Sequence, residues 1–174
     1  MPQFELTAVV MTEGVAKRHA TPTQLGAIGA SQVDPAFTVQ FGSGTSDTYF
    51  GPTPGTKPIP GTRHAYQVPF LGFARIACPD VEVDVIHLPL PEYIWTVDLV
   101  IELTFSLGVD RPAPPRERFE AFLSRDLESI AWPFLREHIA SISTRLGSPM
   151  IVAPPKLNHP VRRRSASVRD ELNN

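Results

Sequence analysis

The sequence predicts an α+β fold in which an antiparallel sheet comes first and helices that cover one of its faces follow. Up to about residue 107, apolar and polar residues alternate in several short segments, as they do in half-buried strands. Prolines crowd residues 111–115 and end this pattern. Beyond them, apolar residues recur every three or four positions, the spacing of one helix face. Strands followed by helices are typical of this fold class.

Five segments carry strand patterns. They are Gln3–Thr12, Ala36–Phe41, Tyr66–Ala77, Val81–Leu88 and Trp95–Leu107. The last has the strongest signal, because one of its sides is entirely apolar: Val97, Leu99, Ile101, Leu103 and Phe105. In the first, strict alternation would place four apolar residues on one face: Phe4, Leu6, Ala8 and Val10. Pro69 lacks a backbone donor, so the third segment is expected at a sheet edge or with a bulge.

Two long polar segments separate the first three predicted strands. Lys17–Pro35 is rich in small and polar residues, and Gly42–Gly61 contains Gly, Pro, Ser and Thr throughout. Both are predicted to be loops. Loops as long as Gly42–Gly61 are uncommon in compact domains and are often functional or mobile.

The C-terminal half carries a helical pattern. Arg116–Arg125 predicts a short amphipathic helix, and a longer helix is expected from Leu127 to Leu146. Pro133 lies inside the longer helix and should kink it or mark a restart. Arg136 and Glu137 are expected on a polar side of this helix, in ion pairs within the helix or between subunits.

One domain is expected for a chain of 174 residues. We predict that the domain spans residues 1–155 and closes with an extended apolar piece, Met150–Val152, before Pro154 and Pro155. Residues 156–174 contain three consecutive arginines and few apolar residues, so they are predicted to form a disordered basic tail.

The sequence lacks the patterns of common catalytic and cofactor sites. It contains no HExxH motif, no GxSxG elbow and no phosphate-binding loop, and its single cysteine is Cys78. We therefore expect no catalytic residues, no metal and no cofactor, and so no enzyme. A net charge of −2 gives no reason to expect nucleic acid or a membrane surface as a partner. The lack of a secretory signal pattern and of a long apolar run favours the cytoplasm, without membrane insertion.

Residues 127–155 resemble the signature region of the SecB protein-export chaperones. The long helix of that family carries an aromatic residue, a proline, a second aromatic residue, two further residues and Glu, which matches Trp132 to Glu137. Four further features follow both in the family and in this sequence. They are a basic residue, a small residue that stops the helix, a proline and an extended segment that ends near Ala-Pro, here Arg145, Gly147, Pro149 and residues 150–154. The chain looks most like the divergent SecB-like members, which also place a short helix before the proline-containing one. Some of these serve toxin–antitoxin systems.

The resemblance implies a SecB-like four-stranded antiparallel sheet followed by a long C-terminal helix packed on one face. It also implies an ATP-independent holdase chaperone that binds unfolded polypeptides, for protein export and translocation or for a dedicated client such as an antitoxin. The expected assembly is a homotetramer, a dimer of dimers. An alternative is a dedicated protein-binding adaptor of the same fold without general chaperone activity. SecA is a possible partner, but the basic tail argues against it, because export SecB proteins dock this motor with an acidic tail.

Two sets of residues are candidates for these roles. Apolar residues at breaks between the predicted elements are candidates for client binding: Tyr49, Phe50, Tyr93, Trp95, Met150 and Ile151. Apolar residues of the long helix are candidates for the core or the subunit interface: Leu127, Ile130, Trp132, Phe134, Leu135, Ile139, Ile142 and Leu146. Because Trp132 and Phe134 cannot share a helix side, we expect more apolar surface than one sheet and one helix can bury.

Overall fold

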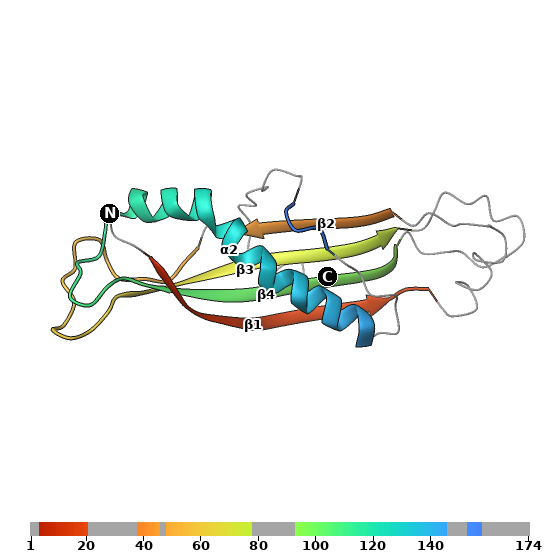
Figure 1. The fold of residues 1–174 in the computed structure, drawn as a ribbon, viewed down its shortest axis with the longest axis horizontal. Coiled ribbons are helices and arrows are strands. Elements are labelled where there is room, and N and C mark those ends of the chain that lie inside the picture. The colour runs from red at the N-terminus through yellow and green to blue at the C-terminus, as the bar shows by residue number, and fades with distance from the viewer. Residues whose placement is uncertain (1–3, 21–37, 46–47, 78–92, 146–152, 158–174) are drawn as a thin grey trace, which may run out of the picture.

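The described part of the chain forms an antiparallel sheet with a long helix across one face (Figure 1). The structure is a computed structural model that describes residues 4–20, 38–45, 48–77, 93–145 and 153–157. Its elements are β1 (Glu5–Arg18), β2 (Thr38–Thr45), β3 (Ala65–Ala77), β4 (Tyr93–Ser106) and α2 (Arg116–Arg145). The strands pair in the order β1-β4-β3-β2, so β1 and β2 form the two edges. The predicted four-stranded antiparallel sheet with a long helix after it is confirmed.

Some element boundaries differ from the prediction. Strand β2 covers residues 38–45 instead of 36–41 and so includes the start of the predicted loop. Strand β4 begins at Tyr93, two residues early. The predicted strand Val81–Leu88 and the predicted tail from residue 158 onward lie outside the described residues.

Strand β1 contains two bulges. It continues to Arg18, beyond its predicted end at Thr12. Its register against β4 shifts twice, which leaves Thr7 and Thr12 as extra residues. Their hydroxyls donate to main-chain carbonyls of β4, Thr7 to Thr104 at 3.1 Å and Thr12 to Val100 at 3.2 Å. The extra residues are therefore tied to the neighbouring strand.

The bulges change which side of β1 faces the helix. Val9 lies opposite Leu103, a buried residue, whereas Val10 lies opposite Glu102 and is 54% exposed. The expectation that Phe4, Leu6, Ala8 and Val10 share one face is therefore wrong beyond Leu6. Each extra residue reverses the alternation that follows it, and a sequence pattern with a strict period of two cannot show this.

Strand β3 lies inside the sheet, between β4 and β2, although Pro69 had suggested an edge or a bulge. Strand β2 ends with Thr45 opposite Phe70, and the next pairing on that side is the isolated bridge between Phe50 and Gln67. Pro69 lies between these two pairings. Among the described residues, no pairing on this side of β3 falls at Pro69, so its missing N–H removes none of the described ladder bonds.

The core lies between the sheet and α2. The predicted apolar side of β4 is fully buried: Val97, Leu99, Ile101, Leu103 and Phe105. The side of β3 that faces the helix is buried as well: Tyr66, Val68, Phe70, Gly72 and Ala74. Each fully buried aliphatic or aromatic side chain contributes roughly 1.5–3 kcal/mol relative to an exposed one. These two central strands are therefore the main support of the fold.

Helix α2 is continuous from Arg116 to Arg145, so the expected separation into a short and a long helix is wrong. Figure 1 shows that the helix bends part-way along its length. Pro133 lies inside it, lacks the N–H that would bond to residue 129 and accounts for the bend. The buried helix residues are Phe119, Leu127, Ala131, Trp132, Leu135, Ile139 and Ser143.

Gly72 of β3 allows the helix to pack close to the sheet. A Cβ atom at this position would lie 2.4 Å from Leu135 Cδ1 and 2.9 Å from Leu135 Cδ2. Leu135 is fully buried and has little room to move aside. The missing side chain at Gly72 is therefore what lets Leu135 seat against the sheet.

Gly72→Ala should lower the free energy of unfolding by about 1–3 kcal/mol, the usual cost of adding a methyl group to a filled core. Chemical denaturation followed by circular dichroism measures this change. Gly108→Ala is the matched control, because a Cβ there meets nothing nearer than Arg111 Cγ at 3.5 Å. Equal midpoints for the two variants would contradict the close contact between Gly72 and Leu135.

Candidate functional site

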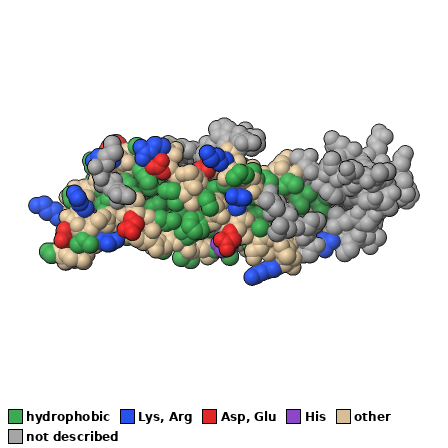
Figure 2. Space-filling view, viewed as in Figure 1, with side chains coloured by type: hydrophobic (Ala, Val, Ile, Leu, Met, Phe, Trp, Pro, Cys, Tyr) green, Lys and Arg blue, Asp and Glu red, His purple; other side chains and the backbone are tan. Residues whose placement is uncertain are grey.

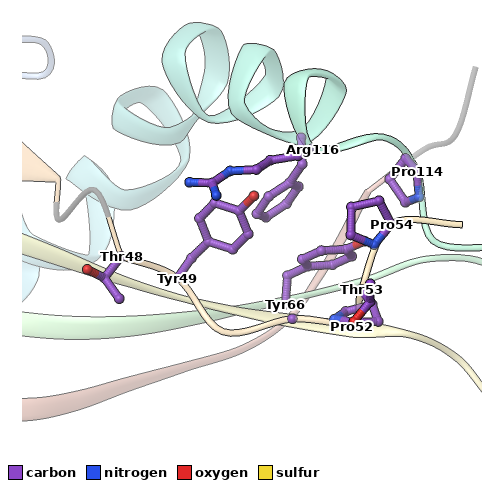
Figure 3. A pocket seen from close by; sticks show the side chains of 10 residues that line it. Thr48, Tyr49, Pro52, Thr53, Pro54, Tyr66, Pro114 and Arg116 are labelled. Carbon is purple, nitrogen blue, oxygen red and sulfur yellow. The ribbon is translucent and has the colours of Figure 1, made fainter. Parts of the chain in front are cut away.

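An open cavity of about 410 Å³ lies at the end of the sheet where α2 begins (Figure 3). Three segments form it: the loop after β2, the start of β3 and the turn that leads into the helix. The lining residues are Thr48, Tyr49, Gly51, Pro52, Thr53, Pro54, Tyr66, Pro114, Arg116 and Phe119. Aromatic rings and prolines make most of the wall apolar.

The loop that forms one wall is held by backbone hydrogen bonds. Phe50 and Gln67 exchange two N–H···O bonds, at 2.9 and 2.8 Å. Further along, Gly55 N donates to Ala113 O at 3.0 Å, and Ala113 N donates to Thr56 O at 2.9 Å. The loop is thus attached to β3 on one side and to the turn before α2 on the other. These attachments keep its tyrosine and prolines against the cavity.

The aromatic walls are supported from behind by further rings. Tyr66 stacks on Phe119 with ring centroids 4.2 Å apart, and Tyr49 meets Phe119 edge-on at 4.8 Å. Phe4 lies 5.1 Å from Phe119 and stacks on Phe122 at 4.7 Å. Such pairs contribute about 0.5–1.5 kcal/mol each beyond their buried area, so the walls are pre-formed.

Arg116 places a positive charge at the rim, with its guanidinium above the Tyr49 ring (Figure 3). The guanidinium carbon lies 6.0 Å from the ring centroid, and Arg116 Nε donates to Glu120 Oε1 at 2.7 Å. Burial raises the pKa of Tyr49 above its ordinary value of 10.0, and the neighbouring Arg116 opposes this rise. Burial also raises the pKa of Tyr66, and Tyr49 adds to the effect. Both hydroxyls are therefore protonated at neutral pH and can donate hydrogen bonds.

The cavity combines apolar walls, two hydroxyl groups and one cation. This combination is suited to holding an apolar or aromatic group while a few polar contacts fix its orientation. Within the described residues, no group of three or more His, Cys, Asp or Glu side chains could hold a metal ion. No helix in the described part of the chain is long and apolar enough to cross a membrane.

The predicted client-binding residues are divided between two places. Tyr49 lines the cavity, and its neighbour Phe50 is 64% exposed. Tyr93 is half-buried, with the Arg75 guanidinium 5.8 Å from its ring centroid. Trp95 is 1% exposed, and its Nε1 is buried without a hydrogen-bond partner among the described residues.

These two places are far apart. Tyr66, beside the cavity, pairs with Phe105, whereas Tyr93 pairs with Ala77 at the other end of β3. At about 3.3 Å per residue, most of the length of β3, roughly 35 Å, separates them. The cavity therefore does not include Tyr93 or Trp95. Met150 and Ile151 lie outside the described residues.

Sequence reasoning missed most of the cavity wall. Tyr66 has the signal of a strand residue, and Phe119 that of an amphipathic helix. Arg116 and Pro114 lie at the proline-rich break between the last strand and the helix, and in the sequence this break indicates only a boundary between elements. The unusual length of Gly42–Gly61 was the one signal that pointed to this place. The other lining residues become a site only through their neighbourhood in the fold.

The predicted residues of the long helix fall into two groups. Four are buried in the core: Leu127, Trp132, Leu135 and Ile139. Three are half-buried and pack against the margin of the core: Ile130, Phe134 and Ile142. Ile130 and Phe134 are one turn apart and form a short stripe along one side of the helix, whereas Ile142 lies about 120° around the helix axis from Ile130. Leu146 lies outside the described residues.

No protein-family model and no curated protein sequence matches the chain. Among solved structures, it is similar to the Mycobacterium tuberculosis Rv1957 SecB-like chaperone, solved in complex with a ChAD peptide from the Rv1956 HigA1 antitoxin. The TM-score is 0.59, and the match covers 87% of this chain and 89% of that chain. The fold is SecB-like. At 14% sequence identity the similarity establishes the fold alone, and at this level the expectation from the signature region is confirmed.

Tyrosine ionisation should reveal the buried cavity walls of this SecB-like chain. Burial raises the pKa of two of its three tyrosines, Tyr49 and Tyr66. The folded state therefore holds these protons more tightly than the unfolded state. The resulting stability is present below pH 10.0 and is lost as the pH rises from there through the raised folded-state values.

Phenolate absorbance during an alkaline titration measures this effect. The part of the phenolate absorbance that appears only at the highest pH should be smaller in Tyr49→Phe, and smaller in Tyr66→Phe, than in the parent chain. Each variant should also lose less stability above pH 10.0 than the parent chain. If both substitutions left the alkaline end of the titration curve unchanged, the two rings would not form buried walls.

Proposed function

We propose that the protein is an ATP-independent holdase that binds unfolded or non-native polypeptides at the cavity beside the start of α2. The observation that carries this proposal is the open, pre-formed aromatic cavity on a SecB-like fold. Unfolded chains expose apolar and aromatic side chains that native proteins bury. An apolar cavity removes such side chains from water, and this transfer drives binding without nucleotide.

Exposed apolar side chains also occur on the loop after β2 and on the turn that is hydrogen-bonded to it. Phe50 is 64% exposed and Ile59 on the same loop is 75% exposed, while Val109 on the neighbouring turn is 45% exposed. Figure 2 shows hydrophobic side chains along much of the helix-bearing face. Large exposed apolar surfaces mark places where a protein binds something else. These side chains are further apolar surface that a client could contact outside the cavity.

The half-buried stripe on α2 supports self-association. Ile130 and Phe134 pack against the core on one side and keep part of their surface in water on the other. A second copy could cover that surface, and a homotetramer arranged as a dimer of dimers is the expected assembly. Self-association would leave the cavity at the end of the sheet available to clients.

An antitoxin is one client class that the comparison favours. The similar mycobacterial chaperone was solved with a peptide from an antitoxin. If this chain were an adaptor for one such client, it would bind that client without protecting unrelated polypeptides. An aggregation assay with an unrelated protein therefore separates the holdase from the adaptor.

The purified chain should suppress light scattering by heat-aggregating citrate synthase without ATP, at molar ratios near one. Tyr49→Ala should weaken this protection several-fold, because it removes an aromatic wall of the cavity. Truncating an aromatic anchor costs more than about 1–2 kcal/mol of binding, a factor of roughly ten. Half-protecting concentrations measured by scattering give the effect.

Tyr93→Ala is the matched control, since it removes the same side chain from the opposite end of the sheet. It should leave the half-protecting concentration unchanged. Equal losses in both variants would argue against the cavity as the client site. A wild-type chain that leaves aggregation unaltered would argue against the holdase itself.

Phe134→Glu should shift the protein to a smaller species in analytical ultracentrifugation, because a buried charge would oppose contact through the stripe. Glu137→Gln changes an exposed residue of the same helix and should not alter the sedimentation coefficient. A wild-type chain that sediments as a monomer would exclude the expected tetramer.

A further inference from the structure

A short C-terminal segment, Ala153–Leu157, lies along α2 near edge strand β2 (Figure 1). Two side chains of the helix donate hydrogen bonds to its main chain. Trp132 Nε1 donates to the carbonyl of Pro154 at 2.7 Å. Arg136 Nε, expected from the sequence to form ion pairs, donates to the carbonyl of Ala153 at 2.9 Å.

The segment lies against α2 and the core, beside the sheet edge, and the surface beneath it is called the groove below. Phe41 of β2 meets Trp132 edge-on, with ring centroids 6.4 Å apart. Ala153 is 2% exposed and belongs to the core, and Leu157 packs against the core margin. Lys156 is exposed. The groove thus encloses one small side chain and presents donors to the neighbouring carbonyls.

These contacts depend little on the identity of the residues that make them. Every residue carries a carbonyl, and an indole N–H and a guanidinium donate to any of them. Proline fixes φ near −65° and favours an extended conformation at the residue before it. A sequence such as Ala-Pro-Pro therefore presents its carbonyls outward, without hydrogen bonds of its own. Unfolded polypeptides populate the same extended conformation.

We propose that this groove is a second polypeptide-binding subsite, which takes an extended, proline-containing client segment with a small side chain and is filled in the client-free protein by residues 153–157. The client segment replaces the internal one and accepts the same two hydrogen bonds from Trp132 and Arg136. The inference rests on the proposed binding of non-native polypeptides. It adds a second attachment point and a competing internal segment.

Competition follows from the way the internal segment is held. Among the described residues, its contacts with α2 include two hydrogen bonds to side chains, and Ala153 buries a single methyl group. A client that makes the same contacts can replace it. The apparent dissociation constant for the client is the intrinsic value divided by the fraction of molecules with an open groove. Expelling the internal segment should therefore tighten client binding.

Ala153→Arg tests the inference, because a long charged side chain does not fit a position that is 2% exposed. The substitution expels the segment and leaves β2 and α2 unaltered. The probe is fluorescein-labelled α-lactalbumin, reduced and carboxymethylated so that it stays unfolded, titrated by fluorescence anisotropy. We expect binding tighter by at least about fivefold. Lys156→Arg, at an exposed position of the same segment, should bind the probe as the parent chain does.

Trp132→Phe distinguishes a binding groove from a clasp that only fixes the C-terminal segment. The smaller ring keeps apolar contact with Phe41 and removes the N–H donor. In the double variant with Ala153→Arg, Trp132→Phe should remove several-fold of the affinity that Ala153→Arg gains. The client accepts a hydrogen bond from the same indole N–H, which phenylalanine lacks. A clasp would give unchanged or weaker probe binding in Ala153→Arg, with no further effect of Trp132→Phe. That result would overturn the inference.

An experiment with the unmodified chain covers the case in which Ala153→Arg unfolds. A synthetic peptide of residues 150–157 should displace the labelled probe from the parent chain, and a scrambled peptide should not. No displacement at roughly millimolar peptide, the effective concentration of a tethered segment, would overturn the subsite. If wild-type protection of citrate synthase persists in that case, the subsite alone fails. If protection and probe binding are both absent, the proposed function fails as well.

Discussion

One helix is narrower than a four-stranded sheet, and the rest of this structure depends on that difference in width. A helix with its side chains is about 10 Å across, whereas the axes of four strands about 4.8 Å apart span roughly 15 Å. Helix α2 can therefore seal only the centre of the sheet, where Leu135 lies against Gly72. On the edge strands, Val9 of β1 and Phe41 of β2 are only partly buried against the core. Among the described residues, the cavity and the groove beside β2 both lie at the margin of the surface that α2 covers.

The sequence predicted the central layer well, because that layer obeys simple periods. Strand β4 alternates without interruption from Trp95 to Phe105, and the helix keeps its apolar spacing through Pro133. The errors fall where one residue breaks a period. Thr7 and Thr12 insert bulges that an alternation rule cannot see, since their hydroxyls bond to a strand distant in sequence. The strand that contains Pro69 was expected at an edge or with a bulge, because whether a central strand tolerates a proline depends on where the neighbouring strand ends.

The client-binding candidates show that sequence periodicity also fails to place the residues of a site. Tyr93 and Trp95 are two residues apart, so simple alternation places them on one face of β4. A register shift skips Ile94 between their partners on β3. Tyr93 therefore lies near Arg75, whereas Trp95 is buried in the core. Tyr49 was found because it stands in a conspicuously long loop. Tyr66 and Phe119 could not be found, because their aromatic character is equally typical of core residues.

The segment after the helix gives a physical basis to the signature that first suggested the fold. Trp132 and Arg136 are one helical turn apart and so project from the same side of α2. They bind Pro154 and Ala153 in the reverse order, so the segment runs antiparallel to the helix. Within the described residues, the aromatic-proline part of the signature region and its Ala-Pro end are therefore in direct contact.

A contact built from apolar side chains on both partners would have specified which sequence could lie there. The side-chain donors of Trp132 and Arg136 bind main-chain carbonyls, so they select chiefly for a segment with an extended backbone. The burial of Ala153 adds the requirement that one residue of this segment be small. A groove that recognises its own chain in this way also fits a segment of an unfolded chain. The feature that identifies the fold is therefore also one that a polypeptide-binding protein can use.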